Sequence, residues 1–162
     1  MSLIPAEHYV KIVELLPILC VDIVVQNRRG EYLLVKRANQ PKKGQWWPMG
    51  GRVLKGETLE QAAIRKTREE SALQVKSVQP LGYFETVADA NPFELPFPYH
   101  TVSVVFAAFV DDQQKIILDD QSVEWKYARE LPEGFCIKPF YAFELGDPTR
   151  RSSRFPGERR ET

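Results

Sequence analysis

The 162-residue sequence has few cysteines, no long apolar run and no excess of either charge. Cys20 and Cys136 form no metal-ligand spacing, so we expect buried free thiols, which are typical of a reducing cytoplasm. The longest apolar runs, 18–25 and 102–110, are interrupted by polar residues and are shorter than the roughly 18 residues of a membrane-spanning helix. Lys+Arg and Asp+Glu number 22 each, which excludes a broadly basic protein that binds nucleic acid.

The composition is that of an ordinary globular protein, with 43% hydrophobic and 27% charged residues. The length predicts one domain, which we place at residues 1–145. Residues 146–162 hold five arginines and three acids, which favours a flexible, solvated tail over a phosphate-binding arm. The first residues lack a basic stretch followed by an apolar core, so we expect no export signal, a cytoplasmic location and no membrane partner.

The first third of the chain predicts a helix, a hairpin and a loop. Apolar residues recur at helical spacing over 6–16 until Pro17 stops them. β-Branched strands over 17–26 and 31–37 flank a turn at 27–30 and form the hairpin. Residues 39–51, rich in Pro, Gly and Trp, are predicted to be a loop.

A second helix is predicted from Leu59 to about Ser71, because Thr58 and Gln61 have the spacing of a capping box. The later segments are expected to be strands at 75–87, 100–110, 115–118 and 123–127, with a Pro-rich loop at 88–98. We therefore expect an α+β fold, in which a mixed β-sheet is sandwiched between α-helices.

Two neighbouring glutamates are predicted to lie on the apolar side of the second helix. Steps of about 100° place Glu69 and Glu70 near Leu59 and Ala63, where an unpaired carboxylate is costly. A hard divalent cation such as Mg²⁺ would offset that cost and would also bind substrate phosphates. The alternative is that the preceding basic residues, Arg65 and Lys66, neutralise both acids along the helix.

The residues around this helix resemble the Nudix box, the signature of the Nudix hydrolase family. The matching positions of the pattern are Gly51, Glu57, Arg65, Glu69 and Glu70. Two positions depart from it, since Lys66 stands where the family has a glutamate and Ala72 where it has a glycine. The resemblance implies a Nudix-type fold and a hydrolase that acts on a nucleoside diphosphate-linked substrate.

The resemblance also implies a magnesium site, with Mn²⁺ as an alternative metal. Its ligands would be Gly50 through its carbonyl, Glu69, Glu70 and Gln121. Lys66 removes one potential ligand and adds a positive charge, so we expect fewer metal ions than in a typical member. The lysine could also pair with Glu70 and occupy the cation's place, although long lysine side chains often extend away from such faces.

Outside the box, the chain is similar to the GDP-mannose mannosyl hydrolase branch. The similar features are Asp22 in the first strand, the pair 36–37 and the stretch 50–53. In this branch water attacks the anomeric carbon of the sugar, and the nucleoside diphosphate leaves intact. The branch also implies a homodimer, with the helix at residues 1–16 as its contact.

Arginines near the glycine-rich loop are the expected ligands of the diphosphate. Arg37 and Arg52 flank this loop, and a guanidinium group suits a leaving group that gains negative charge. Arg65 would orient the carboxylates of the box. Asp22 alternates with apolar residues on one strand face, which indicates either a buried acid with a partner or a residue of the site.

Ser122 stands where the branch has a catalytic histidine, and a serine hydroxyl is a poor general base near neutral pH. The remaining candidate bases are Glu124, His100 and Glu85. Glu124 also fits a solvated strand position, and His100 a position at the core edge. Tyr99, at the end of the aromatic Pro-rich segment, is a candidate for contact with the base or sugar.

Three functions therefore stay open. The first is hydrolysis of a nucleoside diphosphate sugar at carbon, in the manner of a GDP-mannose mannosyl hydrolase. The second is cleavage of a phosphoanhydride, as in most Nudix enzymes. The third is a catalytically weak nucleotide-binding domain, which the lysine in the box and the absent histidine favour.

Overall fold

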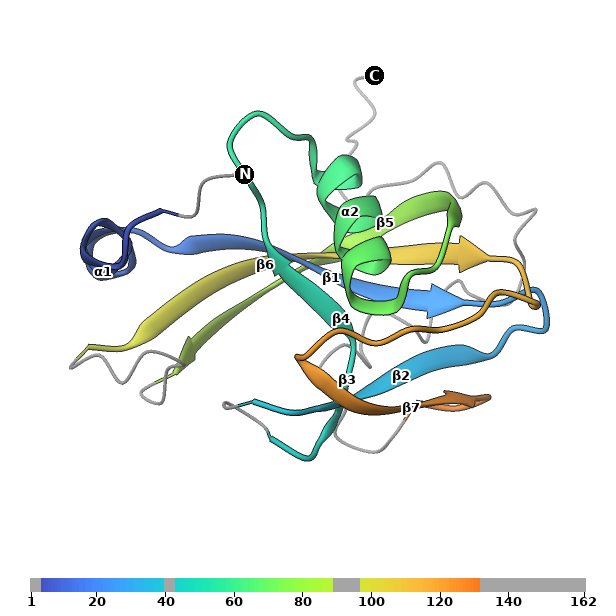
Figure 1. Cartoon of the computed structure of the whole chain (residues 1–162). Helices are drawn as coiled ribbons and strands as arrows, with labels where there is room; N and C mark the ends of the chain where they lie inside the picture. Colours follow the sequence, from blue (N-terminus) through green and yellow to red (C-terminus); the bar gives the residue numbers. More distant parts are fainter. Residues whose placement is uncertain (1–3, 40–42, 89–96, 132–162) are drawn as a thin grey trace, which may run out of the picture.

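The computed structural model describes residues 4–39, 43–88 and 97–131. Each of the two helices in these segments is followed by a group of strands (Figure 1). In chain order they are α1 (Ala6–Leu15), β1 (Ile18–Gln26), β2 (Tyr32–Arg37), β3 (Trp46–Trp47), β4 (Met49–Arg52), α2 (Leu59–Ser71), β5 (Val75–Ala88), β6 (Tyr99–Val110) and β7 (Ser122–Ala128). Neither helix has the length and hydropathy needed to cross a bilayer.

The strands form one mixed sheet in the order β3-β2-β1-β6-β5, with β4 paired to β1 and β7 paired to β2. β1 and β6 run parallel over Ile18–Gln26, and the other pairs are antiparallel. This confirms the expected α+β class with a mixed sheet, and β1 and β2 pair at the predicted hairpin turn. The expected tail at 146–162, Cys136 and most of the loop at 88–98 lie outside the described residues.

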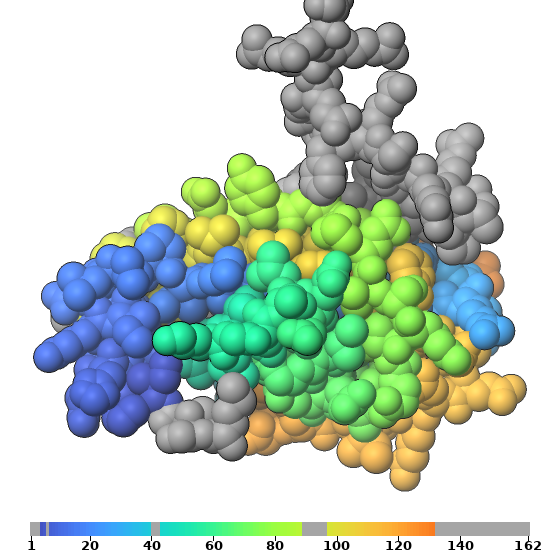
Figure 2. All heavy atoms as spheres, turned by 90° about the horizontal axis from the view of Figure 1, so that it is seen from above, coloured from blue at the N-terminus to red at the C-terminus, as the bar shows by residue number. Residues whose placement is uncertain are grey.

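Hydrophobic side chains pack on both faces of the sheet. Val21, Ile23 and Val25 of β1 pack with Ala62 and Ala63 of α2 in the larger core. The neighbouring residue Val24 points the other way and packs in a second cluster, because successive strand residues alternate between faces. α1 lies at the end of the long strands β1 and β6 (Figures 1 and 2).

The position of the site depends on a change of partner along β1. Its last residues, Val25 and Gln26, pair with β2, whereas residues 20–23 pair with β4. The first half of β1 and the second half of β2 therefore diverge. Asp22 lies opposite Gly50 in this register, so both face the opening between the strands.

Two strand predictions were wrong. Residues 39–51 were expected to be a loop, but β3 and β4 form there on either side of Pro48, because β2 and β1 supply their hydrogen-bonding partners. Residues 115–118 were expected to be a strand. Instead, the Ile117 amide donates to the carbonyl of Ser71, at the end of α2, so the segment packs on the core without joining the sheet.

Local signals at both ends of α2 explain its bounds. The Thr58 side chain accepts from the Gln61 amide while the Gln61 side chain accepts from the Thr58 amide, which confirms the capping box. After Ser71 the chain turns at Ala72, whose φ of 60° is in the left-handed region. An alanine is strained there because its Cβ approaches the following carbonyl oxygen.

We expect the Ala72→Gly substitution to raise the free energy of unfolding by about 1 kcal/mol, because glycine adopts this conformation without the steric penalty. Urea denaturation would measure the change. The matched control is Ala62→Gly in the body of the same helix, which should lower the free energy by about 1 kcal/mol or more. A loss of stability in both variants would contradict the strain at Ala72.

Candidate functional site

A small cavity opens where β1 and β2 diverge, between their backbones and the C-terminal half of α2. Polar and charged groups make up much of its wall. Its lining residues are Asp22, Val35, Arg37, Trp47, Pro48, Gly50, Glu70, Gln121 and Ser122. Five of the residues proposed from the sequence for catalysis or binding therefore meet here, namely Asp22, Arg37, Gly50, Glu70 and Gln121.

Glu70 is the buried acid of the cavity, with a side chain only 6% exposed. Burial raises the pKa of its carboxyl to about 7, and the charge of Asp119 acts in the same direction. The Lys66 ammonium and the Gly50 amide, which both contact the carboxylate, oppose this shift. Because the pKa of about 7 already includes these two contacts, the carboxyl without a cation nearby would be neutral at neutral pH.

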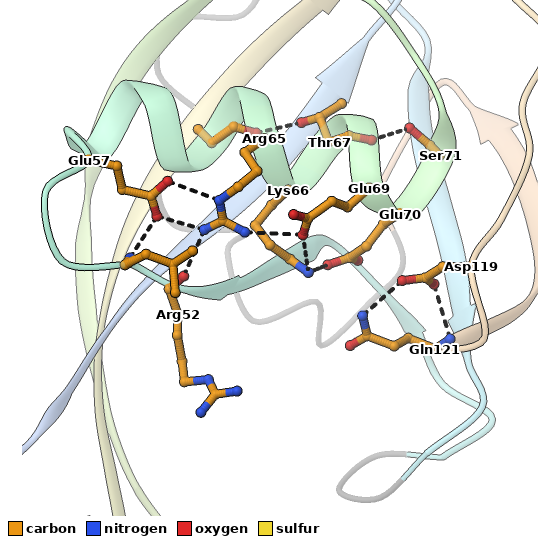
Figure 3. Close-up of polar contacts among 12 residues, drawn as sticks. Arg52, Glu57, Arg65, Lys66, Thr67, Glu69, Glu70, Ser71, Asp119 and Gln121 are labelled. Carbon is orange, nitrogen blue, oxygen red and sulfur yellow. Dashed lines mark hydrogen bonds and ion pairs between the residues drawn. The ribbon is translucent and has the colours of Figure 1, made fainter. Parts of the chain in front are cut away.

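Lys66 supplies that positive charge in the structure. Its Nζ lies 2.7 Å from Glu70 Oε1 and 3.5 Å from a carboxylate oxygen of Glu69 (Figure 3). The side chain is 11% exposed, so it does not extend away to solvent as long lysines often do. The pairing considered from the sequence, in which the lysine neutralises Glu70, is the one observed.

Glu69 lies outside the buried face that the helical spacing predicted for it. Its side chain is 49% exposed and pairs with Arg65 Nη1 at 3.1 Å. The prediction that both carboxylates share the apolar side was therefore wrong for Glu69. A residue at the margin of a helix face can rotate outwards when a guanidinium group offers it a partner there.

Arg65 fastens the loop before α2 to the helix. Its Nε and Nη2 donate to the two oxygens of Glu57 at 2.9 and 2.6 Å, and Nη2 also donates to the Arg52 carbonyl. The paired guanidinium holds the pKa of the Glu57 carboxyl below its usual range. Glu57 in turn accepts from the Leu54 amide, so one ion pair fixes the path of residues 52–57.

Asp22 faces the cavity from β1. Burial raises the pKa of its carboxyl to about 6, while a hydrogen bond with Ser103 and the charge of Arg37 lower it. The sequence indicated either a buried acid with a partner or a residue of the site. Asp22 is both, since it bonds to Ser103 and also lines the cavity. Ser103 was missed because it lies on β6 and meets Asp22 only through the parallel pairing of the strands.

Gln121 reaches the cavity from the segment before β7. Asp119 accepts hydrogen bonds from the Gln121 amide nitrogen at 3.0 Å and from its Nε2 at 2.8 Å (Figure 3). With Nε2 committed to Asp119, the side-chain oxygen is the end available to a cation. Asp119 was missed from the sequence, although its position two residues before Gln121 is the spacing of an Asx turn.

The second expected diphosphate ligand, Arg52, lies outside the cavity lining. Its guanidinium is 4.5 Å from the centre of the Tyr9 ring, a cation–π contact with α1. The Tyr9 hydroxyl also lies 3.4 Å from the hydroxyl of Tyr99. Cys20 packs in the same cluster, and burial raises the pKa of its thiol to about 12. On β1, Cys20 pairs with Arg52 and Asp22 pairs with Gly50. Because Cys20 and Asp22 are two residues apart on the strand, the side chains of both pairs face the same side of the sheet.

The remaining candidates also lie outside the cavity lining. Glu124 is 56% exposed and pairs with Lys36 Nζ at 3.1 Å. His100 and Tyr99 are neighbours on β6 and so point to opposite faces of the sheet. Glu85 is an exposed residue of β5, which β6 separates from β1.

The residues around the cavity include a partial set of ligands for a divalent ion. Among the described residues, no three His, Cys, Asp or Glu side chains gather as a metal-binding group. The cavity lining does include Glu70, Gly50 and Gln121, whose carboxylate, carbonyl and amide oxygens are hard donors of different kinds. This set fits one Mg²⁺ that keeps several water ligands.

Asp22 generates a pH-dependent prediction. Its folded pKa of about 6 exceeds its ordinary value of 3.8, so between these values the unfolded state holds fewer protons. We therefore expect its contribution to stability to be complete below about pH 4 and to be lost as the pH rises through 6, with a slope of at most about 1.4 kcal/mol per pH unit.

Urea denaturation from pH 4 to 7 with a chelator would compare the wild type with Asp22→Asn. The variant should lose this part of the slope and gain relative stability as the pH rises. Glu60→Gln, at an exposed position of α2, is the control and should keep the wild-type slope. An unchanged slope in Asp22→Asn would show that the folded carboxyl has an ordinary pKa.

Comparison with known proteins identifies the family. Residues 16–135 match the NUDIX domain. The low-salt glycan biosynthesis protein Agl8 of Haloferax volcanii is 33% identical over 131 residues, which are 81% of this chain and 83% of that relative. The ADP-ribose pyrophosphatase of Methanocaldococcus jannaschii is 36% identical over 90 residues, which are 56% of this chain and only 49% of that relative.

The fold comparison agrees with the sequence comparison. The crystal structure of a MutT NUDIX hydrolase from Burkholderia pseudomallei matches with a TM-score of 0.62 at 23% identity, covering 74% of this chain and 90% of that chain. The family match includes β1, the glycine-rich strand β4 and the whole of α2, which together build the cavity. The chain therefore belongs to the Nudix hydrolase family, whose members act on nucleoside diphosphate-linked substrates.

Proposed function

We propose that the chain hydrolyses a nucleoside diphosphate sugar in a Mg²⁺-dependent reaction. The observation that carries this proposal is the cavity itself, whose lining includes the proposed metal ligands Glu70, Gly50 and Gln121 together with Arg37. A diphosphate needs both a hard metal ion and a guanidinium group as its charge grows in the transition state. One Mg²⁺ at the oxygen donors would supply the Lewis acid that polarises the diphosphate.

The protein's own residues divide the remaining work. Arg37 binds the diphosphate in the cavity, and Arg52, on the same side of the sheet as Asp22, binds it from the α1 side. Arg65 keeps the loop and Glu69 in place through its hydrogen bonds. Asp22 accepts hydrogen bonds from the substrate, and Tyr99 at the start of β6 is the proposed contact to the sugar or base. His100 points to the opposite face of the sheet and is left out of the proposal.

The relatives support two substrate classes. The name of Agl8 places that protein in glycan biosynthesis, which fits a nucleotide sugar as substrate and the GDP-mannose mannosyl hydrolase branch. The name of the Methanocaldococcus protein instead describes cleavage of the pyrophosphate of ADP-ribose. The nucleotide sugar is favoured because the Agl8 match extends over most of both chains.

Ser122 motivates the second candidate reaction, cleavage of a phosphoanhydride. It lines the cavity at the position where the mannosyl hydrolase branch has a histidine. A serine hydroxyl does not accept a proton near neutral pH without another base. Glu124, the other proposed base, is held by Lys36 and would have to leave this ion pair to take part.

Product analysis in ¹⁸O water distinguishes the two reactions. The protein is incubated with GDP-mannose, other nucleotide sugars and ADP-ribose, with and without Mg²⁺, and the products are identified by mass. We expect an unlabelled nucleoside diphosphate and a labelled sugar, formed only with Mg²⁺. A labelled phosphate product would establish attack at phosphorus, and no product from any substrate would favour the nucleotide-binding domain without turnover.

We expect Glu70→Gln to abolish most turnover, because it removes the buried carboxylate from the metal-binding set. The measurement is kcat with saturating Mg²⁺ on the substrate identified above, and Glu60→Gln is the matched control on the exposed side of the same helix. Activity of Glu70→Gln within a factor of about three of the wild type would refute the metal assignment.

We also propose that the protein is a homodimer in contact through the N-terminal helix. Leu15, Leu16 and Leu19, at the junction of α1 and β1, are 74%, 61% and 44% exposed, and such apolar side chains favour burial against a partner. Sedimentation would show a dimer for the wild type and a monomer for a double Leu15→Asp, Leu16→Asp variant. Unchanged assembly of a folded variant would refute this contact.

A further inference from the structure

Lys66 is more buried than Arg65 or Lys36, and its ammonium contacts two carboxylates. Its Nζ lies 2.7 Å from Glu70 and 3.5 Å from Glu69, and only 11% of its side chain is exposed (Figure 3). An ammonium in this position loses most of its hydration and needs the two acids in return. Lys36, in comparison, is 36% exposed in its pair with Glu124.

The backbone next to Lys66 provides the space for this side chain. A Cβ on Gly51 would lie 2.9 Å from Lys66 Cε and 3.5 Å from its Nζ. The aliphatic part of the lysine therefore passes directly over the Gly51 backbone of β4. This close contact directs the ammonium towards the two glutamates and leaves it little freedom to turn to solvent.

Both carboxylates already contact a cation without a metal ion, although Arg65 also pairs with Glu57. Glu70 is neutralised by Lys66, and Glu69 is shared between Lys66 and Arg65. A divalent ion between the two carboxylates would have to displace the ammonium or lie against its positive charge.

We propose that Lys66 is a resident cation that takes the place of a metal ion between Glu69 and Glu70, so that Glu69 is not a metal ligand in this chain. The inference deepens the proposed function, since it restricts metal binding to the cavity side of Glu70, with Gly50 and Gln121. A bound divalent ion would exchange with solvent, whereas the ammonium of Lys66 is part of the chain and cannot leave.

Binding of Mn²⁺ to the whole protein without substrate tests this proposal. The number of bound ions and their Kd are measured by electron paramagnetic resonance for the wild type, Lys66→Met and Lys66→Arg. Methionine keeps the apolar stem and removes the charge, whereas arginine keeps the charge. We expect Lys66→Met to bind Mn²⁺ at least tenfold more tightly or to bind one additional ion, and Lys66→Arg to stay within threefold of the wild type.

Substitution of Glu69 separates the inferred site from a general change in charge. Glu69→Gln should change the Kd of the wild type less than twofold, because the lysine already excludes metal from this carboxylate. In the Lys66→Met background the same substitution should remove most of the gained affinity. Such coupling between positions 66 and 69 is what a double-mutant cycle measures.

The proposal is overturned if Glu69→Gln weakens Mn²⁺ binding to the wild type tenfold, or if Lys66→Met binds as the wild type does. Thermal unfolding with and without Mn²⁺ shows which variants are folded. If Lys66→Met does not fold, the Lys66→Gln variant replaces it, and the Glu69→Gln result in the wild type stands by itself. These outcomes do not depend on turnover, so a failure to hydrolyse nucleotide sugars would leave them interpretable.

Discussion

The burial of one carboxylate, that of Glu70, constrains the centre of this molecule. An acid removed from water at this depth stays ionised only beside a cation and hydrogen-bond donors, and Lys66 and the Gly50 amide provide them. The lysine reaches it because Gly51 has no side chain. Helix α2 and strand β4 are joined by the Gly50 amide, which donates to Glu70, and by Arg65, which donates to the Arg52 carbonyl.

The sheet provides the opening in which this charged group acts. β1 changes its partner from β4 to β2 along its length, so the two central strands separate on one side. Asp22 lies at the point of separation, where its backbone is still paired on both sides but its side chain faces the cavity. The same change of partner makes Gly50 necessary, since a Cβ there would lie 2.5 Å from the carboxylate of Asp22.

Features that depend on neighbours in the chain were predictable from the sequence. The capping box at Thr58 and the spacing of apolar residues gave α2 its correct bounds, and the hairpin turn was found between its two β-branched strands. The strands β3 and β4 were missed because short, Gly-rich and Trp-rich segments become strands only through distant partners. The segment at 115–118 was predicted to be a strand from its apolar pattern, but it joins no strand. Its Ile117 amide instead donates to the carbonyl of Ser71 at the end of α2.

The sequence by itself indicated the family and the order of the charged residues along α2, because the box pattern is local information, and the resemblance implied Gly50, Glu70 and Gln121 among the residues that meet in the cavity. The helical spacing already offered the pairs Arg65–Glu69 and Lys66–Glu70 as an alternative to a metal, and only the tertiary structure decided which of these side chains are buried. Glu69 turned outwards to Arg65, Lys66 turned inwards over Gly51, and Asp119 fixed the amide of Gln121. The burial of Lys66 depends on Gly51, which lies on β4 and leaves room for the side chain, and the spacing along one helix does not encode a contact with another segment.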